Sequence, residues 1–289
     1  MKLFQQIASS PIIRLARFHQ QRHQQVQLQQ PRRNMHIQYI KMRWGTGDNY
    51  AYLVTDEKTK HTLVIDPAEP DTVLPVIHKL EREGTIKLTG IVNTHHHYDH
   101  SGGNDKLRKA FPDLPIIAGS NSPLVTTTPS DRSTFKLGQD VKITALHTPC
   151  HTQDSICYYV QDHDQKIVFT GDTLFTAGSG RFFEGTADEM DVALNQTLAS
   201  LPDDTKVYPG HEYTASNVKF AKTVLVNEPL LELEKFVSQN EITTGIFTIG
   251  DEKKHNPFML VQNNQIQQKL GLTDRVQVMA KLRELKNNF

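Results

Sequence analysis

The sequence predicts an α/β fold followed by a smaller helical region. In the first 211 residues, short apolar segments typical of buried strands alternate with amphipathic segments of helical spacing. After residue 211 the strand pattern stops, and the apolar residues recur at helical spacing. A chain of 289 residues with 37% hydrophobic and 22% charged content can bury one large core and a small second domain.

The expected strands are short apolar runs that occur in chain order at residues 50–55, 62–66, 90–94, 115–118, 141–148, 155–160, 166–170 and 206–208. Helical patterns separate them at residues 71–83, 104–111 and 188–201. The helical region has amphipathic segments at residues 217–226, 230–239 and 275–286. We therefore divide the chain into residues 1–34, 35–211 and 212–289.

The first 34 residues differ in composition from the rest of the chain. They carry Lys and Arg but no Asp or Glu, begin with an apolar stretch and end in a glutamine-rich tail. This composition is typical of a mitochondrial transit peptide, and a disordered basic tail is the alternative. We therefore expect the protein in the mitochondrial matrix, while translation from Met35 would give a cytosolic form.

Charge, hydropathy and cysteine usage argue against several classes of partner. The 32 basic and 32 acidic residues balance, so we expect no nucleic-acid partner. No apolar run approaches the roughly 18 residues of a membrane span, so we expect no membrane partner. The two cysteines, Cys150 and Cys157, lie in strand-rich sequence, which favours reduced thiols over a disulfide.

The most informative segment is the histidine-rich loop that follows the strand at residues 90–94. It contains four potential metal ligands, which are His95, His97, Asp99 and His100. Residues two apart point the same way in an extended chain, so His95 and His97 can bind one cation while Asp99 and His100 turn toward another. His96 points the opposite way, and we expect it to form hydrogen bonds behind the ligands.

Three further candidate ligands follow a pattern of an apolar strand, a glycine or proline turn, and a ligand residue. They are His151 in TPCHT, Asp172 in TGDT and His211 in YPGHE. We expect these turns to gather along one edge of a sheet, where they would complete a site for two metals. His147 lies inside a strand, and we expect packing or hydrogen bonding there instead of metal ligation.

The ordered motifs resemble those of a known family. THHHYDH is similar to the signature of the metallo-β-lactamase superfamily, and TPCHT, GDTLF, EGTADEM, PGHEYT and NPFM resemble glyoxalase II, the hydroxyacylglutathione hydrolases. The resemblance covers residues 35–289. It implies a four-layer αββα sandwich with a C-terminal helical domain that binds glutathione, and a mitochondrial member of fungal type.

The resemblance also implies a dinuclear metal site. His95, His97 and His151 would bind the first metal, Asp99, His100 and His211 the second, and Asp172 both. Zinc is expected, with iron and manganese as alternatives. With Asp99 and Asp172 among their ligands, the metals would hold a hydroxide that attacks a thioester carbonyl and releases glutathione thiolate without a general acid. The implied reaction converts S-(2-hydroxyacyl)glutathiones, such as S-D-lactoylglutathione, to glutathione and a hydroxy acid, D-lactate, in the second step of methylglyoxal detoxification.

The substrate contacts implied by the resemblance are Arg181, Phe183, Tyr213, Asn217, Arg283 and Lys286. Arg283 and Lys286 are three residues apart on one helical face and could clamp a glycine carboxylate. Without the resemblance, a solvated basic face is the plainer interpretation of this pair. Phe183 stands where animal enzymes of the family have tyrosine, so a hydroxyl donor is missing. We expect a monomer.

Three alternatives share this fold. A glutathione persulfide dioxygenase would use one iron and would not need Asp99, His100 and His211. A tRNA-processing nuclease would need a basic surface. A non-catalytic glutathione-binding protein would not need a full set of metal ligands.

Overall fold

The computed structural model describes residues 35–42 and 48–289. The expected transit peptide, residues 1–34, lies outside the described residues.

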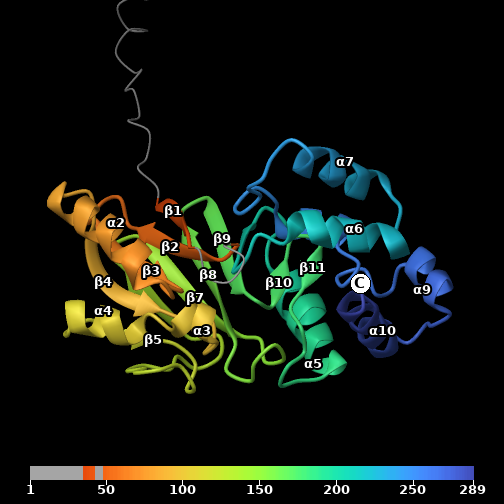
Figure 1. Ribbon diagram of the computed structural model, residues 1–289, viewed down its shortest axis with the longest axis horizontal. Coiled ribbons are helices and arrows are strands. Elements are labelled where there is room, and N and C mark those ends of the chain that lie inside the picture. Colours follow the sequence, from red (N-terminus) through yellow and green to blue (C-terminus); the bar gives the residue numbers. More distant parts are fainter. Residues whose placement is uncertain (1–34, 43–47) are drawn as a thin grey trace, which may run out of the picture. The chain divides into compact units, whose positions relative to one another are not determined.

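Two five-stranded sheets form the centre of the α/β part (Figure 1). The first has the order β1 (His36–Lys41), β2 (Tyr50–Thr55), β3 (His61–Ile65), β4 (Lys87–Val92) and β5 (Ile116–Ile117). The second has the order β12 (Lys206–Pro209), β9 (Gln165–Gly171), β8 (Ile156–Asp162), β7 (Val141–His147) and β6 (Thr134–Leu137). Strands β3, β4 and β5 are mutually parallel, as are β12 and β9, and the other pairs are antiparallel.

Three apolar clusters hold the layers together. Side chains such as Tyr52 and Phe169 fill the space between the two sheets. Helices α2 (Pro70–Arg82) and α4 (Asn104–Ala110) cover the outer face of the first sheet through residues such as Ile77 and Leu107. The outer face of the second sheet packs on α5 (Ala187–Val192) and on the C-terminal helices. The expected four-layer αββα sandwich is confirmed.

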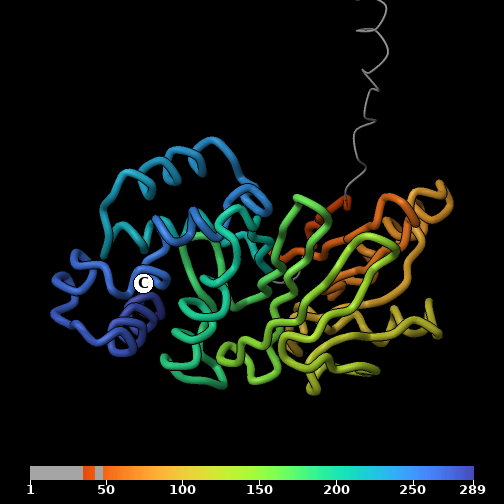
Figure 2. Tube along the Cα trace, turned by 180° about the vertical axis from the view of Figure 1, so that it is seen from behind, coloured from red at the N-terminus to blue at the C-terminus, as the bar shows by residue number. Residues whose placement is uncertain are grey.

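The C-terminal region contains helices α6 (Thr214–Val224), α7 (Glu228–Val237), α8 (Ile249–His255), α9 (Asn264–Leu270) and α10 (Arg275–Asn287). Figure 2 shows this region beside the second sheet, on the side away from α2 and α4. A short hairpin, β10 (Leu174–Phe175) and β11 (Gly178–Ser179), lies between the sheet and the helices. None of the helices in the described part of the chain is both long and apolar enough to cross a membrane.

The expected elements are recovered with small shifts at their ends, but some expectations were incomplete. The helix expected at residues 188–201 is α5 continued by a π-helical turn (Ala193–Thr197) and a 3-10 turn (Leu198–Ser200). Strands β1 and β6 and helices α8 and α9 were not predicted, because edge strands and seven-residue helices carry little periodicity. Both cysteines are buried and free, as expected.

The topology places the carboxyl ends of four strands together. Because β8 is antiparallel to both β7 and β9, these two strands run the same way, and β12 is parallel to β9. The histidine-rich loop instead leaves β4, which belongs to the first sheet. The turns that carry His151, Asp172 and His211 lie along one edge of the second sheet, as expected, and the site forms where the histidine-rich loop of the first sheet meets them.

Candidate functional site

The histidine-rich loop is shaped by hydrogen bonds to its own backbone and by one buried carboxylate. Asp66, at the end of β3, accepts hydrogen bonds from the Thr94 backbone N–H and hydroxyl, both at 2.7 Å. The Ser101 hydroxyl donates to the His96 and His97 carbonyls at 2.7 and 3.1 Å. His97 then caps the short helix α3 (Tyr98–Ser101), which carries Asp99 and His100. These contacts turn His95, His97 and His100 toward a common point.

Two glycines bring the second sheet close to this loop. Gly171 ends β9 at φ 47°, a left-handed conformation that favours glycine, and directs the chain to Asp172. At Gly210, just before His211, an added Cβ would lie 2.5 Å from Asp172 Oδ1. A side chain at Gly210 would therefore push the Asp172 carboxylate out of the cluster.

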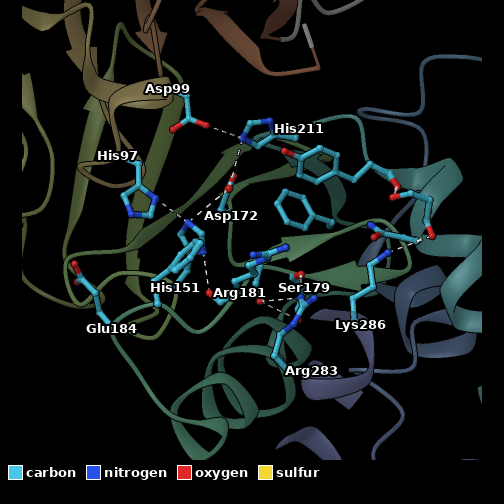
Figure 3. Close-up of a pocket in the computed structure, with 16 residues that line it drawn as sticks. His97, Asp99, His151, Asp172, Ser179, Arg181, Glu184, His211, Arg283 and Lys286 are labelled. Carbon is cyan, nitrogen blue, oxygen red and sulfur yellow. Dashed lines mark hydrogen bonds and ion pairs between the residues drawn. The ribbon is translucent and has the colours of Figure 1, made fainter. Parts of the chain in front are cut away.

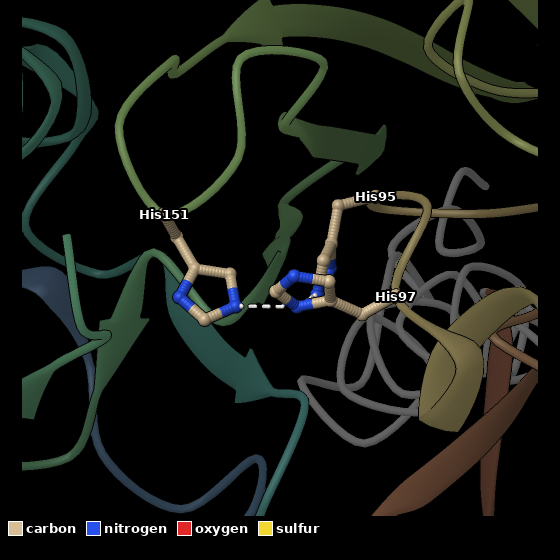
Figure 4. A group of neighbouring side chains, drawn as sticks. All are labelled: His95, His97 and His151. Atoms are coloured by element: carbon tan, nitrogen blue, oxygen red, sulfur yellow. Dashed lines mark hydrogen bonds between the residues drawn. The ribbon is translucent and has the colours of Figure 1, made fainter. Parts of the chain in front are cut away.

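The seven expected ligands converge in three overlapping groups. Within each group the donor atoms lie within 4.8 Å of one another; the groups are His95, His97 and His151, then His95, His100 and Asp172, then Asp99, His100 and His211. The first group is shown in Figure 4, where the three imidazoles point toward one another. His97 Nδ1 lies 3.1 Å from His95 Nε2 and 3.0 Å from His151 Nε2.

Nitrogens so close together fit a shared cation. Three nitrogens bound to one tetrahedral zinc ion at about 2.0–2.1 Å would lie roughly 3.3 Å apart. In the third group His100 Nε2 lies 3.2 Å from His211 Nε2, and Asp99 Oδ2 lies 3.4 Å from the same His211 atom. Asp172 Oδ1 is buried and has no hydrogen-bond partner among the described residues. Imidazole and carboxylate donors in this arrangement suit divalent cations.

The outward-facing nitrogens of three histidines are held by acceptors. His100 Nδ1 lies 2.9 Å from Asp66 Oδ2, and His211 Nδ1 lies 3.0 Å from Asp48 Oδ1. His151 Nδ1 lies 2.9 Å from the Arg181 carbonyl oxygen. A hydrogen bond at Nδ1 fixes each ring with Nε2 facing the cluster. Burial lowers the pKa values of His100 and His211, but the Asp172 charge outweighs burial and raises both, that of His211 to about 9, so a metal must displace their Nε2 protons.

The protein alone gives the cluster a strongly perturbed charge state. Burial disfavours the Asp172 carboxylate, but His211 and His100 outweigh it and lower the pKa of Asp172 well below its usual value. Burial and the nearby His100 lower the pKa of His95 well below its usual value. His95 therefore keeps a lone pair, while Asp172 keeps its charge, as metal ligation requires.

A pocket of about 860 Å³ opens onto this cluster. Figure 3 shows that Asp99, Asp172 and His211 lie at one end, and that Arg181, Arg283 and Lys286 lie toward the other. All six residues expected to contact substrate line the pocket, namely Arg181, Phe183, Tyr213, Asn217, Arg283 and Lys286. The structure thus brings together the two residue sets that the sequence suggested.

The aromatic residues lie nearest the histidines. The Tyr213 ring is stacked on His211 with centroids 4.7 Å apart, and the exposed Phe183 ring lies 5.3 Å from the His151 ring. Asn217 is buried and its amide donates to the Thr176 carbonyl at 3.1 Å, so one donor is already in use. Phe183 and Tyr213 therefore form the apolar wall beside the cluster.

The two histidines expected to act away from the cluster do so. His96 Nδ1 lies 2.8 Å from Asp154 Oδ1, which ties the histidine-rich loop to the loop after His151. His147 Nε2 lies 2.8 Å from the Pro129 carbonyl oxygen. Neither residue belongs to the three donor groups.

Sequence reasoning missed Asp48 and Asp66, which hold His211 and His100. Asp66 follows strand β3 directly, so it obeys the same rule of a strand followed by a polar residue, but it was counted as part of the strand. Asp48 precedes strand β2 and has no such signal. Only the folded chain shows that these carboxylates lie behind the histidines.

Comparison with known families separates the chain into two matched parts. Residues 44–211 match the metallo-β-lactamase superfamily, and residues 212–289 match the hydroxyacylglutathione hydrolase C-terminus. The chain belongs to the hydroxyacylglutathione hydrolase family. The family includes a Schizosaccharomyces pombe protein named "Probable hydroxyacylglutathione hydrolase glo2", which is 55% identical over 88% of this chain and 99% of its own length.

Two Saccharomyces cerevisiae relatives differ in their named location. The cytoplasmic isozyme of hydroxyacylglutathione hydrolase is 47% identical over 88% of this chain and 100% of its own length. The mitochondrial enzyme is 46% identical over 88% of this chain and 96% of its own length. Among solved structures, ETHE1 from Myxococcus xanthus is 26% identical with a TM-score of 0.60, covering 86% of this chain and 97% of that one. The named relatives and the metallo-β-lactamase match show that this chain is a metal-dependent hydrolase. Its clustered histidines and aspartates are the residues that could bind the metal.

The contact between Asp66 and His100 gives a first test. We expect Asp66→Asn to weaken binding of divalent metal roughly 10–100-fold, because asparagine has one acceptor oxygen, whereas Asp66 uses one oxygen for the Thr94 N–H and the other for His100. Competition with a chelator measures this change. Asp56→Asn is the control. Asp56 is also buried, but its carboxylate accepts hydrogen bonds from the Lys58 and Gln139 backbone N–H groups and from no residue of the cluster. Equal metal retention by both variants would show that Asp66 has no role at the cluster.

Proposed function

We propose that this hydroxyacylglutathione hydrolase cleaves S-(2-hydroxyacyl)glutathiones, such as S-D-lactoylglutathione, to glutathione and a 2-hydroxy acid such as D-lactate. This reaction is the second step of methylglyoxal detoxification. The observation that supports it most is a single pocket with candidate metal ligands at one end and the cations Arg181, Lys286 and the buried Arg283 at the other. None of these three cations forms an ion pair with a carboxylate among the described residues. An anionic thioester fits such a pocket with its carbonyl at the metal end.

We propose that His95, His97 and His151 hold one divalent metal, that Asp99, His100 and His211 hold a second, and that Asp172 lies between and contacts both. Zinc suits the imidazole and carboxylate donors, and iron and manganese suit them as well. Two such cations would polarise the thioester carbonyl and lower the pKa of bound water to about 7. The close donor distances reported above support this assignment.

The carboxylates of the site are suited to staying ionised. Burial raises the pKa of Asp99, but its hydrogen bond with His211 and the charge of His100 outweigh burial and lower that pKa. The pKa of Asp172 is lowered in the same way, so neither residue is a proton donor at neutral pH. None is needed, because a thiol of pKa about 8.5 leaves as the thiolate. We therefore assign both aspartates to metal binding and to orienting the reacting groups.

Arg283 supports recognition of an anionic substrate. It is 6% exposed, and its Nη1 donates to the Ser179 and Gly180 carbonyls at 3.0 and 3.3 Å. Its Nε has no hydrogen-bond partner within residues 35–42 and 48–289. Burial, with a smaller effect of Arg181, lowers the Arg283 pKa to about 10. Among the described residues no carboxylate forms an ion pair with Arg283. A carboxylate of glutathione would supply the missing counter-charge.

The described donor groups favour this function over the alternatives. Asp99, His100 and His211 are clustered, although a one-iron dioxygenase would not need them. A non-catalytic binding protein would need none of the three groups. Oxygen consumption with glutathione persulfide, without thioester hydrolysis, would instead establish the dioxygenase.

We also propose a monomer that works in the mitochondrial matrix, with a cytosolic form starting at Met35. The basic composition of residues 1–34 and the existence of both a cytoplasmic and a mitochondrial yeast relative support this location. Fusion of residues 1–34 to a fluorescent reporter tests it. Import into mitochondria is expected, and a reporter spread through the cytosol would contradict the import signal.

The direct test of the function is hydrolysis of S-D-lactoylglutathione by the purified protein, with metal content measured on the same sample. We expect rapid release of glutathione with about two divalent metals per chain. An acyl-CoA thioester of similar acyl group serves as the comparison, since it lacks the glutathione carboxylates. Equal rates with both thioesters would rule out the proposed substrate class.

Asp172→Ala should remove both metal binding and turnover, because the carboxylate contacts both donor groups. We expect less than about one hundredth of the wild-type kcat/KM, together with metal content near zero after dialysis. Circular dichroism checks that the variant is folded. Full activity in this variant would refute the position of Asp172 between the two metals.

Arg283→Ala should raise KM roughly tenfold or more and leave the metal content unchanged, because a charge-assisted hydrogen bond is worth about 1.5–3 kcal/mol. Lys281→Ala, on the same helix α10 but paired with Glu284 on the surface, is the matched control and should behave like the wild type. Steady-state kinetics and metal analysis measure both quantities. Loss of metal from Arg283→Ala would contradict its assignment to the substrate.

Lys286 predicts a pH dependence of substrate binding. Burial, then the charge of Arg283, lowers the Lys286 pKa to about 8. The Lys286 amine is therefore positively charged below pH 8 and loses its proton as the pH rises through that value. Because the uncharged amine attracts an anionic substrate less, KM should rise above pH 8. Lys286→Arg keeps its charge in this range and should remove the rise. A KM that rises equally in both proteins would assign the effect to another group.

A further inference from the structure

The NPFM motif lies behind the pocket and contacts the hairpin β10–β11 from the far side. Asn256 begins this motif, and Glu252 precedes it by one turn on helix α8. Both side chains are fully buried, and neither lines the pocket. The proposed reaction gives these two polar residues no role, although burying a carboxylate is costly unless its oxygens are hydrogen-bonded.

One side-chain contact of Glu252 reaches the turn of the hairpin, and the other two hold the carboxylate at the end of helix α8. Glu252 Oε2 accepts hydrogen bonds from the Ala177 backbone N–H and from the Asn256 amide, both at 2.9 Å. Glu252 Oε1 lies 3.1 Å from His255 Nε2. The carboxylate therefore binds the turn of the hairpin to helix α8.

Asn256 holds the two strands of the same hairpin. Its amide nitrogen lies 3.2 Å from the Phe175 carbonyl oxygen and 3.0 Å from the Gly178 carbonyl oxygen. Its own oxygen accepts from the Phe258 backbone N–H at 3.0 Å. One side chain thus contacts β10 and β11 at the residues that pair with each other.

The hairpin needs such support because its turn is strained. Ala177 has φ 54°, a left-handed conformation that is unfavourable for a residue with a Cβ. Such a conformation persists where the surroundings fix it. The hydrogen bond from the Ala177 N–H to Glu252 is the contact that fixes it from α8.

The segment that leaves the hairpin forms part of the site. Gly180 lies against the Asp172 carbonyl and His151 Nδ1 so closely that a Cβ there would clash with both. The Arg181 carbonyl holds His151, and the Ser179 and Gly180 carbonyls hold Arg283. Figure 3 shows these contacts from Ser179 and Arg181 to Arg283 and His151. One short segment thus orients a candidate metal ligand and a candidate substrate cation.

We propose that Glu252 and Asn256 are positioning residues that fix the hairpin and thereby align His151 and Arg283. The part of this inference that concerns substrate rests on the proposed function, whereas the part that concerns metal does not. Loss of the contact lets the hairpin turn relax, which withdraws the Arg181 carbonyl from His151 and the Ser179 and Gly180 carbonyls from Arg283. Both metal retention and KM then change, although neither residue touches metal or substrate.

The experiment compares Glu252→Ala, Asn256→Ala and Glu252→Gln in the full chain. We expect both alanine variants to lose metal to a chelator roughly tenfold faster than the wild type, and to show a KM for S-D-lactoylglutathione raised roughly tenfold. With saturating metal, kcat should change less than KM. Glu252→Gln keeps an acceptor for the Ala177 N–H and should restore both values toward the wild type.

Thr248→Ala is the matched control. Thr248 caps the same helix α8 through its contact with Asp251, so its loss destabilises α8 by about 1 kcal/mol without touching the hairpin. The proposal would be overturned if the alanine variants at Glu252 and Asn256 changed the rate of metal release and KM no more than Thr248→Ala does. If Glu252→Ala does not fold, the comparison of Asn256→Ala with Thr248→Ala decides.

The metal measurement separates this proposal from the proposed function. A wild-type protein that binds metal but hydrolyses no glutathione thioester would refute the function, and the metal-release comparison would still test the hairpin contact. A wild-type protein that hydrolyses the thioester, with alanine variants that release metal and bind substrate normally, would refute the positioning role alone.

Discussion

Five imidazoles and two carboxylates meet at the carboxyl ends of strands from two packed sheets, and several of the imidazole nitrogens lie 3.0 to 3.2 Å apart. Donors this close repel unless protons or cations lie between them, and burial makes extra protons on His95 unfavourable. Other features of the site follow from this constraint. Asp66, Asp48 and the Arg181 carbonyl hold the outer nitrogens, and Gly210 leaves room for Asp172. The energetic cost of assembling such a cluster is offset when divalent cations bind it.

The two parts of the chain divide the chemistry between them. The αββα sandwich supplies the candidate metal ligands from loops at the ends of β4, β7, β9 and β12, which are held by sheet hydrogen bonds. Helix α10 supplies Arg283 and Lys286, and the polypeptide just after β12 supplies Tyr213. The hairpin β10–β11 and the segment that leaves it lie between these parts and contact both. The loops of the sandwich therefore position the candidate metal ligands, and helix α10 separately positions the cations that would bind the anionic end of the substrate.

The sequence predicted which residues gather in the cluster, because each lies in a loop that follows a short apolar strand, and a strand end is a position that periodicity reveals. It could not show that His95 and Asp172 come from different sheets, since sheet order depends on pairing between distant strands. Asp66 was missed because the expected strand ended at residue 66, whereas β3 ends at Ile65 and Asp66 begins the following loop. Glu252 lies on a seven-residue helix that carries little periodic signal, so the NPFM motif was recognised without any physical role. Contacts between residues far apart in the chain, such as His211 with Asp48, appear only in the folded structure.

The central claim is that the seven donors hold a pair of metals where a thioester carbonyl would lie. Anomalous X-ray scattering from crystals of the metal-loaded protein, measured at the absorption edge of the bound metal, tests it most directly. We expect two peaks in the cluster, one against His95, His97 and His151 and the other against Asp99, His100 and His211, with Asp172 between them. A single peak, or metal bound elsewhere with the cluster empty, would contradict the dinuclear centre.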